Sequence, residues 1–123
     1  MSETVKTPEQ LIRELAAEPG VDIPKLPIGT KIIVETTQAV YELIVLNPPH
    51  NVVKVSSTDP RIKGDGVIGQ LNQSLYDLAG KVSLPHRIAK NLRMQFTFAN
   101  ALYLCSAAIS ARVEGDGWHF EVF

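Results

Sequence analysis

The residue types that most often perform catalysis or bind metals are scattered singly along this chain. The three histidines, His50, His86 and His119, and the single cysteine, Cys105, show none of the short spacings that build a metal site. Cys105 lies in an apolar run, so we interpret it as a packing residue and not as a nucleophile. The sequence therefore predicts no catalytic residue, no metal site and no cofactor, and it favours a protein that is not an enzyme.

Two carboxylates could face each other across a hairpin, as acid–base catalysis would require. Glu35 and Glu42 lie in neighbouring β-rich runs on either side of a short turn. Two solvated glutamates explain this arrangement more simply than an acid–base pair does. We interpret both as solvated glutamates on strand faces.

One basic cluster remains as a candidate site. In the run L-P-H-R-I-A-K-N-L-R, four basic side chains, His86, Arg87, Lys90 and Arg93, follow within eight positions, and residues 78–113 contain no acidic residue. If residues 87–93 include a helical turn, the two arginines and the lysine lie on one side of it. Such a patch predicts binding of an anion or RNA. The alternative is a solvated basic face that acids elsewhere balance, and the absence of interleaved aromatic residues argues against nucleic acid.

The composition bounds the class of protein. The chain has 123 residues, 45% apolar and 20% charged, with a net charge of −1, which is typical of one globular domain spanning 1–123. The near-neutral charge argues against a protein that coats nucleic acid. We find no stretch long and apolar enough for a membrane span and no signal peptide, so we expect a cytoplasmic protein without a membrane partner.

An amphipathic helix is predicted near the start of the chain. Thr7 is a suitable N-cap, Pro8 suits the first helical position, and Gln10 completes a capping box. The apolar residues that follow share one face, and a Pro-Gly pair ends the segment. We therefore expect a helix over about 7–18 and an extended linker over 19–30, before a β domain over 31–123.

The remainder of the chain is β-rich. Alternating apolar residues predict strands over 31–36, 40–46, 52–56, 67–71, 92–98, 102–113 and 118–123, whereas residues 74–91 give no clear pattern. Both faces of the 40–46 strand are apolar apart from Glu42, so we expect that strand to be covered on both sides. The predicted fold is mainly β, a small, partly open antiparallel barrel or a two-layer sandwich of about six strands with one N-terminal helix.

Three runs in this region resemble segments of small uncharacterised bacterial all-β proteins. They are G-T-K-I-I-V-E-T-T-Q-A-V-Y-E-L, V-V-K-V-S-S and L-R-M-Q-F, and the resemblance spans roughly residues 28–110. It implies an all-β fold and no particular activity. The order of a helix followed by strands is also similar to the Sm-like RNA-binding barrel, although the acidic and glycine signatures of that family are missing here.

The leading hypothesis is a non-enzymatic small β domain that serves as a binding or assembly module. Its expected partners are a second copy of the chain, giving a homo-oligomer, or another protein. The alternative hypothesis is an anion or RNA binder that uses the basic residues between 81 and 93.

Overall fold

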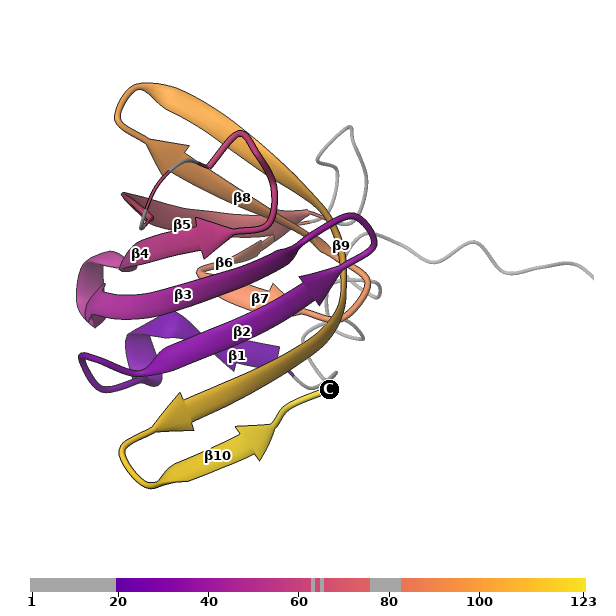
Figure 1. Cartoon of the computed structure of the whole chain (residues 1–123). Helices are drawn as coiled ribbons and strands as arrows, with labels where there is room; N and C mark the ends of the chain where they lie inside the picture. The colour runs from indigo at the N-terminus through magenta and orange to yellow at the C-terminus, as the bar shows by residue number, and fades with distance from the viewer. Residues whose placement is uncertain (1–19, 63, 65, 76–82) are drawn as a thin grey trace, which may run out of the picture.

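The structure is a computed structural model, and it describes residues 20–62, 64, 66–75 and 83–123. Ten strands and two short 3-10 helices make up its regular structure (Figure 1). The strands are β1 (Gly20–Asp22), β2 (Lys31–Thr36), β3 (Val40–Asn47), β4 (Val52–Ser57), β5 (Val67–Leu75), β6 (Ser83–Pro85), β7 (Arg87–Ala89), β8 (Arg93–Phe98), β9 (Ala101–Gly115) and β10 (Trp118–Glu121). The 3-10 helices are η1 (Ile23–Lys25) and η2 (Pro48–His50).

Six of the strands form a closed antiparallel ring. Its order is β2–β3–β4–β5–β8–β9, and β9 returns to β2. Each of these strands therefore has two hydrogen-bonded neighbours, which leaves no open edge within the ring. The barrel alternative is confirmed over the sandwich, and the ring is closed where we expected it to be partly open.

Strand β9 closes the ring because it is long enough to serve two neighbours. Its first half pairs with β8 and its second half pairs with β2. The register shifts in both pairings, between Arg93 and Gln95 on β8 and between Glu35 and Thr36 on β2. Such irregularities bend a strand and increase its twist, and this allows β9 to curve across the molecule as Figure 1 shows.

The interior of the ring is filled by the inward-facing half of each strand. Tyr41, Leu43 and Val45 of β3 are at most 1% exposed, and Met94 and Phe96 of β8 are fully buried. The strand alternation predicted for both segments is thus confirmed. The expectation that β3 is covered on both sides is wrong, because its outward residues are half-buried or exposed.

The described part of the predicted linker, residues 20–30, forms part of the folded body. Strand β1 pairs with β7, and the first backbone N–H of η1 donates to His86 O over 3.2 Å. Ile23 and Ile88 are fully buried in the same apolar cluster as the barrel interior. This small two-stranded sheet therefore packs against the barrel core. The helix predicted over 7–18 lies outside the described residues, and the residues that are described contain no α-helix.

Candidate functional site

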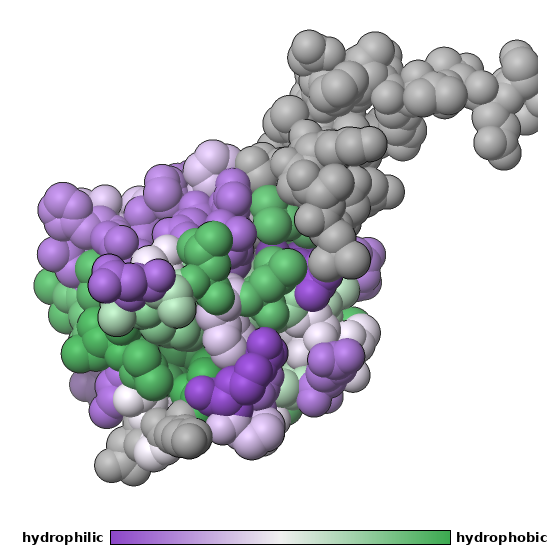
Figure 2. Space-filling model, turned by 90° about the horizontal axis from the view of Figure 1, so that it is seen from above, coloured by the Kyte–Doolittle hydropathy of each residue, from purple (hydrophilic) through white to green (hydrophobic). Residues whose placement is uncertain are grey.

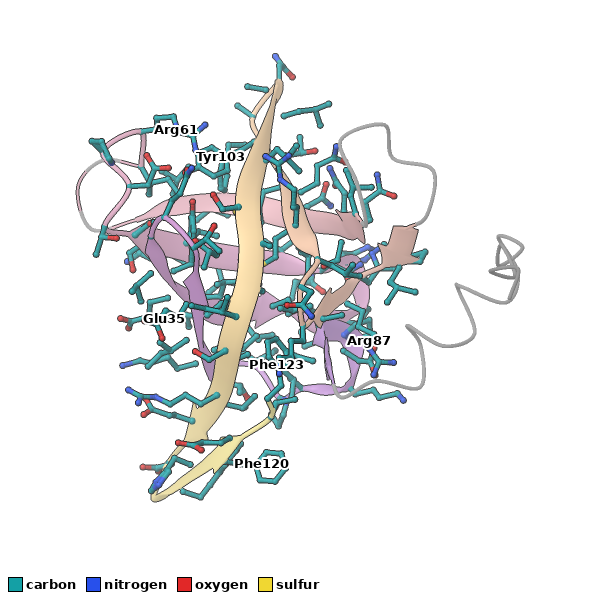
Figure 3. The ribbon with its side chains drawn as sticks, turned by 90° about the vertical axis from the view of Figure 1, so that its right-hand side faces the viewer. Glu35, Arg61, Arg87, Tyr103, Phe120 and Phe123 are labelled. Atoms are coloured by element: carbon teal, nitrogen blue, oxygen red, sulfur yellow. The ribbon has the colours of Figure 1, made fainter. Side chains whose placement is uncertain are left out.

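Strand β10 is an exposed edge of the sheet. It forms a hairpin with β9 and pairs with no other strand in the described part of the chain. All four of its residues are exposed; Trp118 is 47% and Phe120 is 62% exposed. The hairpin turns at residues 116–117, where Gly117 has φ +77°, a conformation that glycine adopts without strain. Figure 3 shows Phe120 pointing away from the body of the barrel.

An apolar groove of about 270 Å³ runs between β10 and the β1–η1 segment. Trp118, Phe120 and Val122 line one side of it, and Val21 and Leu26 line the other. Large aromatic side chains that stay exposed beside an unpaired strand edge are the features that strand-addition interfaces use. Figure 2 shows a further apolar area on the face that it presents. Among the described residues, the most exposed aliphatic side chains on the ring strands are Leu102 at 70% and Ile68 at 62%.

A network of polar side chains connects the β4–β5 loop to the first half of strand β9, away from the residues that pair with β10. The hydroxyl of Tyr103 donates to Asp59 Oδ2 over 2.6 Å, and the hydroxyls of Tyr41 and Tyr103 are 3.0 Å apart. Arg61 Nη2 donates to the same Asp59 oxygen over 2.7 Å, and its backbone N–H donates to Oδ1 over 2.9 Å. The Arg61 guanidinium carbon also lies 4.3 Å from the centre of the Tyr103 ring, at a distance where cation–π attraction operates.

These contacts move the pKa values of the network away from neutrality. The Arg61 guanidinium, and after it the Tyr103 hydroxyl, hold the pKa of Asp59 well below its usual range. Burial, together with the hydrogen bond to Asp59, raises the pKa of Tyr103 to about 12, and burial raises that of Tyr41 further. A general acid or base works best with a pKa near the working pH. These shifts do not suit proton transfer near neutral pH, and the contacts instead fasten the β4–β5 loop to the barrel.

A hollow of about 550 Å³ lies beside this network. The β2–β3 turn supplies Gln38, the β4–β5 loop supplies residues 58–61, and the outer faces of β8 and β9 supply Arg93 and Ser106. Figure 3 shows Arg61 and Tyr103 together near one end of β9, whereas Phe120 lies near the other end. The polar hollow and the apolar groove are thus two separate surfaces.

The structure distributes the predicted basic cluster over different places. Residues 87–89 form strand β7, so the helical turn considered for aligning these side chains is wrong. Arg87 lies opposite Asp22 of β1, with Nε 3.8 Å from Oδ1, and Figure 3 shows it well away from Arg61. Arg93 faces the polar hollow, while His86 and Lys90 are exposed. Anion binding by these four residues stays a prediction.

The other sequence interpretations have clear structural counterparts. Cys105 is fully buried, and burial raises its thiol pKa to about 12, as a packing residue requires. Glu35 and Glu42 do not face each other across the hairpin, because Glu35 lies opposite Val40 and Glu42 lies opposite Ile33. Among the described residues, no group of His, Cys, Asp and Glu could hold a metal ion, and no helix has the length and apolar character needed to cross a membrane.

Sequence reasoning missed the residues of the polar network. Asp59 and Arg61 are two positions apart in the loop, but Tyr103 is 44 positions from Asp59 and meets it only in the folded ring. The short motif D-P-R carries the one local signal, since an aspartate followed two residues later by a backbone N–H donor is typical of an Asx-turn. Comparison with protein-family models, with curated proteins and with solved structures finds no match to this chain.

Proposed function

We propose that this protein is a non-enzymatic assembly module that pairs strand β10 with the same strand of a second copy. The exposed edge of β10, with two aromatic side chains beside an apolar groove, is the observation that supports this function. Exposed edges of this kind template pairing with another strand unless charge, proline or a covering element blocks them. Within β10 the only charged side chain is that of Glu121.

The direction of hydrogen bonding along β10 shows which of its backbone N–H and C=O groups point away from β9. Val122 N–H donates to Ala111 O of β9 over 2.9 Å. Backbone groups of an antiparallel strand alternate between its two sides, so Trp118 and Phe120 also direct theirs toward β9. His119 and Glu121 direct theirs toward the open edge. These two residues would form the hydrogen bonds of an added strand.

The side chains favour one register for pairing between two copies. An antiparallel pair centred on Phe120 sets each Phe120 opposite that of the other copy, because residues directly opposite point to the same face. It sets Trp118 against Val122 of the partner subunit and His119 against Glu121 of the partner subunit. Aromatic and apolar residues then share the groove face, and an imidazole meets a carboxylate on the other face.

This arrangement is symmetric and closed. Each copy offers the same strand and receives the same strand, which is the isologous geometry of a two-fold dimer. A four-residue strand buries little surface alone, and stable interfaces bury on the order of 1,200 to 2,000 Å² in total. The apolar groove beside Trp118 and Phe120 supplies the additional surface on both copies.

Sedimentation velocity across a range of protein concentrations tests the assembly. We expect the wild-type chain to shift from monomer to dimer as concentration rises, and Phe120→Glu to remain monomeric because it places two carboxylates face to face. Ile68→Glu is the matched control, since Ile68 and Phe120 are both 62% exposed but Ile68 lies on ring strand β5. Trp118, the single tryptophan of the chain, also reports on the groove by its fluorescence.

Charge exchange tests the register. In His119→Glu, the new glutamate of each copy lies opposite Glu121 of the other copy, so this variant should weaken the dimer. Adding Glu121→Lys to the same chain replaces this repulsion with attraction and should restore the dimer. A wild-type chain that stays monomeric at every accessible concentration would overturn the proposal. A dimer that Phe120→Glu and Ile68→Glu affect equally would show that the copies meet elsewhere.

A further inference from the structure

The polar hollow between the β2–β3 turn, the β4–β5 loop and strands β8 and β9 has a surplus of positive charge. Its lining includes two arginines, Arg61 and Arg93, and one acidic residue, Asp59, which is a balance of +1. The remaining polar lining consists of Gln38, Thr58 and Ser106, which are uncharged. A concave surface with this composition attracts an anion.

The one carboxylate in the hollow is already occupied. Asp59 accepts hydrogen bonds from the backbone and the guanidinium of Arg61 and from the Tyr103 hydroxyl, and its side chain is only 14% exposed. Nε and Nη2 of Arg61 both donate to this carboxylate, so Arg61 and Asp59 largely offset each other's charge and the surplus positive charge of the hollow is that of Arg93. Arg61 itself stays 59% exposed, with one face over the Tyr103 ring.

Arg93 is held in place by a hydrogen bond to the backbone of β9. Its Nε donates to the carbonyl oxygen of Cys105 over 2.8 Å, which fixes the plane of the guanidinium against β9. No acidic residue in the described ranges forms an ion pair with Arg93. The two terminal nitrogens are thus available as a fork, the geometry that binds the oxygens of phosphate, sulfate or carboxylate.

Hydroxyl donors lie on two sides of the same hollow. Thr58 Oγ1 accepts from Val40 N over 3.0 Å, so its own hydrogen is free to donate elsewhere. Ser106 follows the Cys105 carbonyl that anchors Arg93, and it faces the same hollow. A group with several oxygens can accept from the guanidinium and from these hydroxyls together.

We infer that this hollow binds a small tetrahedral oxyanion, a phosphate group, between Arg61 and Arg93, with Thr58 and Ser106 as hydroxyl donors. The site is separate from the assembly through β10, because the hollow lies along the first half of β9 whereas β10 pairs with the last residues of that strand. The proposed site uses one residue of the predicted basic cluster, Arg93, together with Arg61 of the β4–β5 loop.

Isothermal titration of the wild-type chain with inorganic phosphate, in a buffer of low ionic strength, tests the site. We expect one phosphate per chain, and binding weakened by about tenfold or more in Arg93→Gln, which removes the fork. Arg112→Gln is the matched control because Arg112 is an outward arginine on the second half of β9, beside Glu114. Its affinity for phosphate should equal that of the wild type.

Ser106→Glu is a second variant, which keeps the Arg93 contact to Cys105. It introduces a carboxylate into the hollow and should abolish phosphate binding, with folding verified by circular dichroism. A parallel titration with uridine monophosphate distinguishes a nucleotide from free phosphate, since a nucleotide ligand would bind more tightly than inorganic phosphate. Absence of phosphate binding by the wild type, or wild-type affinity in both Arg93→Gln and Ser106→Glu, would overturn the inference.

Discussion

The hydroxyl of Tyr103 is the central donor of the network that fastens the β4–β5 loop to the barrel. It contacts Asp59 over 2.6 Å, whereas the Tyr41 hydroxyl is 3.4 Å from the same carboxylate oxygen. We therefore expect Tyr103→Phe to lower the free energy of unfolding by about 1 to 2 kcal/mol, because a hydrogen bond to a charged group is lost without creating a cavity. Urea denaturation measures the change. Tyr41→Phe is the control and should cost less; equal stability of Tyr103→Phe and wild type would contradict the assignment.

Asp59 predicts a specific dependence of stability on pH. Arg61 and Tyr103 depress its pKa in the folded state, whereas the ordinary value is 3.8. Between these two values the unfolded chain binds more protons, so stability increases with pH there. The contribution is present above about pH 4 and is lost as the pH falls below it. We expect the wild-type free energy of unfolding to decline more steeply in acid than that of Asp59→Asn, and parallel curves would show that Asp59 is not coupled to folding.

At the residue scale, local pattern identified packing residues but not the polar network. Cys105 was predicted to pack because its neighbours are apolar, and burial depends mainly on that local pattern. The pairing of Asp59 with Tyr103 depends on the route of the chain around the ring, which no local spacing encodes. For the same reason, the sequence did not reveal that Arg87 and Arg93 lie apart. They are six positions apart in the chain, but they lie on different strands and contact different partners.

At the scale of the elements, Gly69 of β5 lies against Phe98 and the Thr97 carbonyl of β8, with no room for a side chain. A side chain at this position would meet the Phe98 ring and would lie 2.6 Å from the backbone oxygen of Thr97 on β8. Since a backbone oxygen cannot move aside cheaply, Gly69→Ala should destabilise the protein by about 1 to 3 kcal/mol. Urea denaturation again measures this. Ile68→Ala, at the exposed neighbouring position, should change stability by less than about 0.5 kcal/mol, and similar losses in both variants would contradict the steric explanation.

The hairpins were predictable because their signals are local. The T-T-Q-A turn joins β2 to β3, and Thr36 Oγ1 accepts from the backbone N–H of Ala39 over 3.0 Å, as short turns of this composition require. The β1–β7 pair was not predictable. Each strand has three residues, and the partners are more than sixty positions apart, so neither alternation nor turn chemistry marks them.

At the scale of the whole molecule, β9 connects two surfaces of different character. Its first half adjoins the polar hollow beside Arg61 and Tyr103, and its last residues pair with β10 at the apolar groove. The net charge of −1 does not reveal this division, because it sums over both ends. We therefore expect Phe120→Glu to leave phosphate binding unchanged and Ser106→Glu to leave sedimentation unchanged. An effect of Phe120→Glu on phosphate binding, or of Ser106→Glu on sedimentation, would indicate that the two surfaces are coupled.

Assembly through β10 also makes thermal stability depend on protein concentration. Dimerisation stabilises the folded chain by mass action, and a hundredfold rise in concentration is worth up to about 2.7 kcal/mol per dimer, which is about 1.4 kcal/mol per chain. For a domain of this size we expect the melting temperature of the wild type to rise by about 2 to 6 °C over that range. Differential scanning fluorimetry, followed by the fluorescence of Trp118, measures the shift. The melting temperature of Phe120→Glu should not vary with concentration, while Ile68→Glu should follow the wild type. A concentration-independent wild type would contradict the dimer, and a concentration-dependent Phe120→Glu would place the interface away from β10.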